Sequence, residues 1–183
     1  MKPLLRFDSV TCRRGGRLLF EDVDLQLGPS EALQVTGPNG SGKSSLIRLA
    51  AGLLGPERGT IERAPLALAD DSLALDRELA LEDALRFWGG DVPAGLSALG
   101  LTALAEVPVR LLSAGQAKRS ALARVAASGA ALWLLDEPSN GLDSQSAGLL
   151  ADCLDRHRAK GGAVLAASHS PLPGEWATVE LGR

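Results

Sequence analysis

The residues with the clearest chemical pattern are a glycine-rich run that ends in a lysine and two serines. Their order matches the spacing G-x-x-x-x-G-K-[ST]. Glycines let the backbone curl and turn its N–H groups inward, and a helix that begins at such a loop adds a partial positive charge, so the run is suited to bind phosphate groups. Lys43 would reach the β- and γ-phosphates of a nucleotide, and the Ser44 hydroxyl would coordinate Mg²⁺. The nucleotide-binding candidates in the run are Gly37, Pro38, Asn39, Gly40, Ser41, Gly42, Lys43, Ser44 and Ser45.

A second chemical pattern is a pair of acids that directly follows an apolar segment. Residues 132–135 read Leu-Trp-Leu-Leu and are followed by Asp136 and Glu137. A charge at the end of a buried strand needs a partner at the edge of the sheet, and a bound metal would be that partner. Asp136 is expected to hold Mg²⁺ through water, and Glu137 to polarise the attacking water as a general base. A chance glycine-rich turn and a solvated acidic strand end are the alternatives, but together the two patterns indicate hydrolysis of ATP or GTP.

The segments around these patterns predict elements that would place both at one edge of a sheet. Strands are expected at residues 7–12, 20–27, 32–36, 66–69, 131–135 and 163–167, and helices at 44–51, 115–128 and 144–157. The first two strands alternate apolar and polar residues and would form an antiparallel hairpin joined by residues 13–19. The later apolar strands alternate with helices, which predicts an α/β fold with a mostly parallel sheet covered on both faces.

A compact helical part is expected in the middle of the chain. Residues 73–110 have a short helical pattern interrupted by glycines and a proline. With the start of the next helix they would form a small helical subdomain over approximately residues 73–125. The whole chain, residues 1–183, is interpreted as a single domain.

Composition narrows the class of protein. The chain has 183 residues, of which 45% are hydrophobic and 22% charged, values typical of one folded domain rather than a disordered chain. The net charge of −3 provides no general attraction for nucleic acid. Cys12 and Cys153 lie far apart, so neither a disulfide framework nor a zinc site is indicated. No apolar run approaches a membrane span or a secretion signal, so association with a membrane is expected through a partner only.

Three further segments have the order and spacing of a known family. Residues 112–116 read Leu-Ser-Ala-Gly-Gln and open a helix, residues 139–143 read Ser-Asn-Gly-Leu-Asp, and His169 lies just after an apolar strand. With the glycine-rich run they resemble the ATP-binding-cassette (ABC) family, in which the signature, the D-loop and the switch histidine occupy these places. The similarity covers nearly the whole chain. It implies a P-loop ABC-type ATPase with an N-terminal antiparallel β portion.

The resemblance also implies that a second copy completes the site. In this family two cassettes enclose two nucleotides head to tail, so the ATP-bound state would be a homodimer, with ATP and Mg²⁺ as cofactors. The signature of one copy would cap the γ-phosphate that Lys43 of the other copy holds. The residues acting in trans would be Ser113, Gly115 and Gln116. Asp143 would lie in the D-loop, and His169 would contact the γ-phosphate and sense its loss.

The chain departs from the family pattern at three places. Ala114 replaces the usual glycine of the signature, at little cost to the start of a helix. Where the family has the glutamine of the Q-loop, this sequence has Asp70, whose carboxylate could bind the metal through water. The aromatic residue that stacks on adenine is missing, and Arg14, whose guanidinium plane can stack on a base, is the candidate in its place.

The remaining aromatic and histidine residues are assigned structural places. Trp88, Trp133 and Trp176 are expected in the core or at an interface, because large aromatic side chains mainly bury area. His157 lies among basic residues and is expected on a solvated face of its helix.

Within the family, the chain is most similar to the ATP-binding subunits of cytochrome c maturation, or haem exporter, systems. The segments that carry this similarity are residues 17–20, 37–47, 49–54, 85–88, 112–125 and 132–138. The similarity implies an ATPase at the cytoplasmic face of the bacterial inner membrane, bound to an integral membrane subunit of the CcmB type. Its hydrolysis would drive a step in haem delivery to apocytochromes c, and no nucleic acid partner is expected. The alternatives are a nucleotide-binding regulatory cassette, the ATPase of another small ABC exporter, and a soluble cassette of DNA repair or translation.

The contact with the membrane subunit is expected between residues 71 and 88. Its apolar groove could be formed by Leu73, Leu75, Leu79, Leu81, Leu85 and Trp88. The alternative is that these leucines only pack the core of the helical subdomain.

Overall fold

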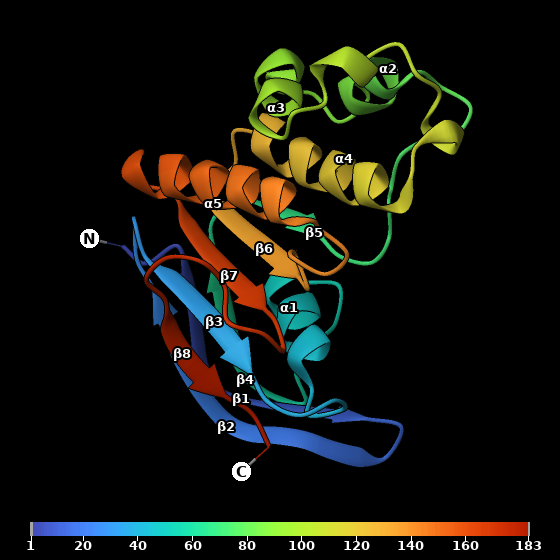
Figure 1. Ribbon diagram of the computed structural model, residues 1–183. Helices are drawn as coiled ribbons and strands as arrows, with labels where there is room; N and C mark the ends of the chain where they lie inside the picture. The colour runs from blue at the N-terminus through green and yellow to red at the C-terminus, as the bar shows by residue number, and fades with distance from the viewer. Residues whose placement is uncertain (1, 183) are drawn as a thin grey trace.

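The computed structural model describes residues 2–182, and at its centre lies a five-stranded sheet (Figure 1). Its strands, in spatial order, are β5 (Leu66–Ala69), β6 (Leu132–Asp136), β7 (Ala163–Ala167), β3 (Ala32–Thr36) and β8 (Ala177–Glu180). Every neighbouring pair is parallel. Strands β6 and β7 are buried along their whole length, which explains their continuously apolar sequences. Because all the strands are parallel, their carboxyl ends meet at one edge of the sheet.

Helices cover both faces of this sheet. On one face α1 (Lys43–Ala51) packs with Leu132 and Leu134, and on the other the remaining helices pack with Trp133 and Leu135. The neighbouring residues of β6 therefore point to opposite layers, as in any strand. The other helices are α2 (Leu81–Arg86), α3 (Val92–Ala98), α4 (Ala114–Ala127) and α5 (Ser144–Ala159), with 3₁₀ turns at Thr102–Leu104 and Val109–Leu111. The predicted α/β class with a parallel, doubly covered sheet is confirmed.

A second, antiparallel sheet lies below the first in Figure 1 and has the order β2-β1-β4. It consists of β1 (Leu5–Arg14), β2 (Arg17–Leu27) and β4 (Arg58–Arg63). The first two strands form the predicted hairpin. The prediction that residues 13–19 connect them is wrong, because β1 ends at Arg14 and β2 begins at Arg17. The strands continue to a two-residue turn at Gly15 and Gly16, whose φ angles of 54° and 79° suit glycine.

The sequence prediction missed β4 and β8. Both are edge strands that lie mostly exposed, and only Ile61 of β4 and Val179 of β8 are partly buried. A strand without a buried face lacks the apolar alternation from which strands are recognised.

The segment over residues 73–110 is less helical than its pattern predicted. Residues 73–80 precede α2 without forming a helix, and Gly89 and Gly90 separate α2 from α3 with φ angles of 75° and 86°. The prediction that Leu75, Leu81 and Leu85 line an exposed apolar groove is wrong. Their side chains are only 8%, 0% and 1% exposed. These side chains pack the core because they fill the space between short helices. Leu79 and Trp88 remain exposed at 42% and 48%.

Gly95 brings α3 close to α4, and we expect Gly95→Ala to lower the free energy of unfolding. A Cβ at this position would lie 2.5 Å from the carbonyl oxygen of Ala123 and 2.9 Å from the Cβ of Ala127, so the helices would have to separate. Overpacking of this kind costs about 1–3 kcal/mol. Replacing a helical glycine gains at most about 1 kcal/mol. Urea unfolding of the two proteins measures the difference.

Gly148→Ala in α5 is the matched control. Nothing lies within 4 Å of a Cβ at that position, so this variant should be as stable as the parent or slightly more stable. If both variants were equally stable, the close approach at Gly95 would have no energetic consequence.

Candidate functional site

The glycine-rich run forms the loop between β3 and α1. Gly37, Gly40 and Gly42 have φ angles of 136°, 81° and 107°, which other residues rarely adopt. The ammonium of Lys43 donates to the carbonyl oxygens of Gly37 at 2.8 Å and Pro38 at 3.1 Å. The lysine therefore bends back over the loop and holds it curled. This places a buried cation beside the N–H groups at the start of α1, an arrangement that can bind phosphate.

Two buried oxygen atoms beside this loop have no hydrogen-bond partner among residues 2–182, namely Oγ of Ser41 and Oδ1 of Asp136. Asp136 ends β6 and is 4% exposed, and its carboxylate accepts a hydrogen bond from the Ser44 hydroxyl. Burial raises the pKa of Asp136, whereas the hydrogen bond from Ser44 lowers it and the charge of Asp71 raises it again. A carboxylate oxygen without a partner, next to a hydroxyl, is a hard oxygen donor set. These residues therefore fit a magnesium ion.

Glu137 and His169 meet at the same edge of the sheet. The Glu137 amide donates to the carbonyl oxygen of Ala167 at 2.8 Å, and its φ angle of 48° turns the chain sharply after β6. This turn directs the carboxylate to the residues that follow β7, where Oε2 lies 2.8 Å from Nδ1 of His169. A carboxylate hydrogen-bonded to an imidazole can accept a proton while the ring keeps it oriented.

The signature segment and Asp143 form the beginnings of two helices. Ser113 caps α4: its Oγ accepts from the amide of Gln116 at 3.3 Å, and Oε1 of Gln116 accepts from the amide of Ser113 at 2.8 Å. Asp143 caps α5 by accepting from the amide of Ser146 at 2.7 Å, and this hydrogen bond lowers the pKa of Asp143. Figure 1 shows the start of α4 in a different part of the molecule from the glycine-rich loop. The chain therefore does not bring its own Ser113 or Gly115 to its own Lys43.

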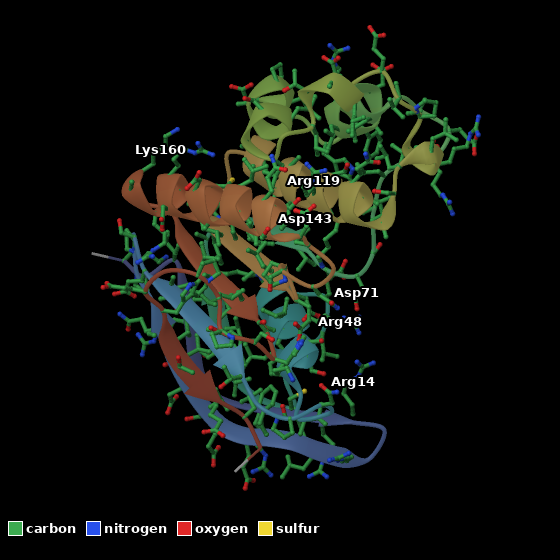
Figure 2. All side chains as sticks on the ribbon, viewed as in Figure 1. Arg14, Arg48, Asp71, Arg119, Asp143 and Lys160 are labelled. Carbon is green, nitrogen blue, oxygen red and sulfur yellow. The ribbon has the colours of Figure 1, made fainter. Side chains whose placement is uncertain are left out.

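Arg14 and Asp70 stand where the family has the adenine-stacking aromatic residue and the glutamine of the Q-loop. Arg14 ends β1 opposite Arg17 and is exposed, and Figure 2 shows it on the same side of the molecule as Asp71. The Asp70 carboxylate accepts from the amide of Ser72 at 3.0 Å in a local turn. Asp71, which was expected only at the beginning of the contact with the membrane subunit, is the residue of this segment whose charge raises the pKa of Asp136.

Two basic residues of α4 were also missed. Lys118 donates to the carbonyl oxygen of Asp136 at 3.3 Å. Arg124 donates to the carbonyl oxygen of Leu68 at 2.6 Å, and its guanidinium carbon lies 4.5 Å from the ring centre of Trp88. Their partners lie 18 and 56 residues away in the sequence, so no local signal could have revealed either contact.

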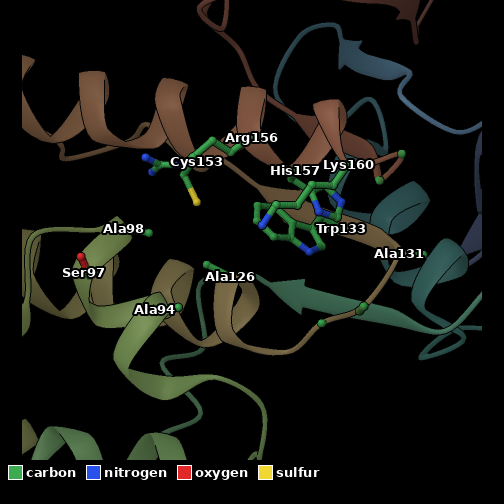
Figure 3. A pocket seen from close by; sticks show the side chains of 14 residues that line it. Ala94, Ser97, Ala98, Ala126, Ala131, Trp133, Cys153, Arg156, His157 and Lys160 are labelled. Carbon is green, nitrogen blue, oxygen red and sulfur yellow. The ribbon is translucent and has the colours of Figure 1, made fainter.

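A cavity of about 600 Å³ lies between α3 and the end of α5, and none of the candidate site residues lines it (Figure 3). His157 lies in this cavity and corrects the expectation of a solvated helix face. Its ring stacks on Trp133 with centroids 3.8 Å apart and an angle of 11° between the planes. Trp133 is itself 6% exposed, as expected for a core residue. The basic residues next to His157 in the sequence indicated a solvated position, whereas its stacking partner lies on β6, distant in the sequence.

The sequence profile of the ABC transporter family matches residues 20–140. This chain belongs to the ABC transporter family. The cytochrome c biogenesis ATP-binding export protein CcmA of Sphingopyxis alaskensis is 51% identical over 180 residues, covering 94% of this chain and 93% of that protein. The protein of the same name from Novosphingobium aromaticivorans is 55% identical over 167 residues, covering 90% and 87%.

Solved structures of the ABC family share the fold. An ATP-binding subunit of an ABC transporter superposes with a TM-score of 0.87 at 24% identity, covering 97% of this chain and 85% of that one. A metal-chelate type ABC transporter in an inward-facing conformation has a TM-score of 0.80 at 26% identity, covering 98% and 80%. Membership of the ABC family implies nucleotide binding, and a subunit of a transport system implies a membrane partner. Within residues 2–182, no helix is long and apolar enough to cross a membrane.

We expect the stability of the protein to fall as the pH drops below about 6.5, and His157 to cause part of this fall. Burial lowers the pKa of His157, although hydrogen bonds to the carbonyls of Ala163 and Ala131 oppose this effect. The unfolded chain therefore binds a proton near the ordinary pKa, whereas the folded protein binds it only at lower pH. His157→Phe keeps a ring on Trp133 and removes the proton. The free energy of unfolding, measured with urea between about pH 7 and pH 5, should fall less in this variant. An identical fall in both proteins would show that His157 titrates alike when folded and unfolded.

Proposed function

We propose that this chain is the ATP-hydrolysing subunit of a bacterial ABC export system of the haem exporter type, which serves the biogenesis of c-type cytochromes. The observation that carries the proposal is the convergence of Lys43, Asp136 and the Glu137–His169 pair at the carboxyl edge of one sheet. The relatives named CcmA, similar over nearly the whole chain, supply the link to cytochrome c.

The glycine-rich loop would bind the phosphates. Oxygens of the β- and γ-phosphates replace the carbonyls of Gly37 and Pro38 as acceptors of the Lys43 ammonium, and the N–H groups at the start of α1 point to the same place. The unpartnered Oγ of Ser41 gains an acceptor there. The guanidinium of Arg14 offers its plane to the adenine ring.

Ser44 and Asp136 would hold Mg²⁺ next to the phosphates, with Asp70 as a more distant ligand through water. The ion, when bound, neutralises the negative charge that the phosphates carry. Within residues 2–182, no group of three carboxylate, histidine or cysteine side chains could hold it without help. Phosphate oxygens and water are therefore expected to complete the shell, which is usual for Mg²⁺.

Glu137 would act as the general base. Its carboxylate accepts a proton from the attacking water as the water oxygen bonds to the γ-phosphorus. The bond between that phosphorus and the β–γ bridging oxygen breaks, so that ATP and water become ADP and phosphate. His169, already hydrogen-bonded to Glu137, orients the carboxylate and would contact the γ-phosphate with its other ring nitrogen.

A homodimer in the ATP-bound state would complete the site. Ser113, Gly115 and Gln116 of one copy approach the γ-phosphate held by the other copy, with N–H groups at the start of α4 facing the anion. Asp143, at the start of α5, would lie at the D-loop contact. In this assembly residues 1–183 form one ABC ATP-binding domain with a helical subdomain over approximately residues 73–125.

The helical subdomain would bind an integral membrane subunit of the CcmB type at the cytoplasmic face of the inner membrane. Large apolar side chains are exposed on it: Leu79 at 42%, Phe87 at 82%, Trp88 at 48% and Leu111 at 61%. The backbone of Leu79 is bonded to that of Val109, so the 3₁₀ turn that carries Leu111 lies next to Leu79. Phe87 and Trp88 form a second pair, with ring centroids 5.7 Å apart. Exposed large apolar side chains of this kind are typical of a protein–protein contact.

We expect Glu137→Gln to retain ATP binding and lose hydrolysis by a factor of about 10² or more, because an amide cannot accept the proton. The uncleaved nucleotide should also trap the dimer. ATPase rate, binding of a fluorescent ATP analogue, and size-exclusion chromatography with Mg²⁺ and ATP measure the three effects. Unchanged turnover would remove Glu137 from the mechanism.

Lys43→Ala tests the binding of the nucleotide rather than its hydrolysis, with the same fluorescent ATP analogue. It removes the cation of the loop, so the ATP analogue should bind about tenfold more weakly or worse. An unaltered affinity would contradict the phosphate-binding role of the loop.

Phe87→Ser should disrupt the membrane partnership and leave the fold and the ATPase of the isolated chain intact, because this side chain is 82% exposed. The measurement is affinity purification of the tagged chain from its native membranes, followed by identification of the co-purifying proteins and an ATPase assay. The parent chain should recover a CcmB-like membrane protein that the variant loses. Leu53→Ser, at a 66% exposed leucine just after α1, is the control and should still recover it. A parent chain that binds ATP, never hydrolyses it and recovers no membrane protein would overturn the proposed function.

A further inference from the structure

Lys118 is a basic residue that the proposed mechanism does not use, and its charge interacts with several carboxylates at the edge of the sheet. It belongs to the second turn of α4, and its ammonium donates to the carbonyl oxygen of Asp136 at 3.3 Å. Burial lowers the pKa of Lys118, and the charges of surrounding carboxylates raise it. The carboxylates are Asp71, Asp136, Glu137 and Asp70.

The other basic residues in this region make their hydrogen bonds with other parts of the chain. Lys43 bonds to the carbonyls of its own loop. Arg119 donates to the carbonyl of Leu99 at 3.0 Å, in the helical part of the molecule, where Figure 2 shows it. Arg124 donates to the carbonyl of Leu68 and lies over a tryptophan ring, and the acid whose charge raises its pKa is Asp70. In the described part of the chain, Lys118 is thus the cation whose charge favours the ionised carboxylate at the end of β6.

The acids after β5 lie beside those after β6 because the two strands are neighbours. Ala69 is the register partner of Leu135, so Asp70 and Asp71 leave the sheet next to Asp136. Asp70, Asp71 and Lys118 also line a common cavity of about 300 Å³. A nucleotide bound at the glycine-rich loop adds further negative charge at this edge. Like charges held this close repel one another, so the cluster needs a compensating cation.

We infer that Lys118 is a positioning residue: it serves as the internal counter-ion of the carboxylates after β5 and β6, and lets a polyanionic nucleotide bind beside Asp71. Its hydrogen bond fixes the carbonyl of Asp136 and with it the end of β6. Its charge offsets the acids that this chain carries at residues 70 and 71. The consequence for nucleotide binding rests on the proposed function, whereas the role as counter-ion does not.

A double-mutant cycle of Lys118→Met and Asp71→Asn tests the inference. The midpoint of urea unfolding is measured without nucleotide, and the affinity for a fluorescent ATP analogue is measured in EDTA. Lys118→Met should lower the midpoint and weaken binding of the analogue about tenfold. Adding Asp71→Asn to that variant should restore most of both losses, because it removes the uncompensated acid. If the effects of the two substitutions simply add in both measurements, the inference is overturned.

Three controls sharpen this test. Lys160→Met makes the same change in net charge at the end of α5, far from the cluster (Figure 2), and should alter neither measurement. Lys118→Arg keeps the charge and should behave like the parent. Lys118→Gln keeps a donor for the Asp136 carbonyl without the charge, so it should couple to Asp71→Asn even if the methionine variant does not fold. An equal loss in the variants of Lys160 and Lys118 would mean that net charge alone is responsible.

The outcomes also separate this inference from the proposed function. A parent chain that fails to bind the analogue, but still shows coupling between Lys118 and Asp71 in urea, overturns the proposed function and leaves the counter-ion in place. A parent chain that binds and hydrolyses ATP with no such coupling overturns the counter-ion alone.

Discussion

A buried carboxylate at the end of an apolar strand sets the arrangement of the site. Asp136 is enclosed because the rest of β6 must be apolar to lie between two helical layers. Burying an ionised group is expensive unless positive or hydrogen-donating groups surround it. The Ser44 hydroxyl and the Lys118 ammonium supply part of that compensation, and one carboxylate oxygen remains without a partner among residues 2–182. The site is therefore prepared for a cation by the same burial that stabilises the sheet.

Helix α4 connects the sheet edge to the helical part of the protein. It begins at the signature serine, carries Lys118 in its second turn, and carries Arg124 further along, against the end of β5 and the ring of Trp88. Its buried residues belong to the same apolar core as one face of the sheet and as α2 and α3. Arg124 therefore contacts both the exposed Trp88 and the strand that precedes Asp70 and Asp71.

The parts of the fold that sequence could predict are those with strong local signals. Strands β6 and β7 were predicted because a short, continuous apolar run is typical of a strand buried on both faces, and the glycine-rich loop because its spacing is specific. Strand β4 was missed because only Ile61 faces the interior. His157 was assigned to solvent because its neighbours in sequence are basic, whereas its partner Trp133 is distant in the chain. Lys118 was missed for the same reason. Its surroundings come from α4 and from the ends of β5 and β6, which are distant in the sequence, so no local pattern indicates them.

The capping box at Ser113 and Gln116 has a consequence for how two copies would meet. Both hydrogen bonds are made within one chain, so the start of α4 already has a fixed shape before any second molecule arrives. Association then requires little ordering of the backbone at this contact, and the unfavourable entropy comes mainly from lost translation and rotation. In the proposed homodimer, the stability of this contact would then depend mainly on the anion held between the two surfaces.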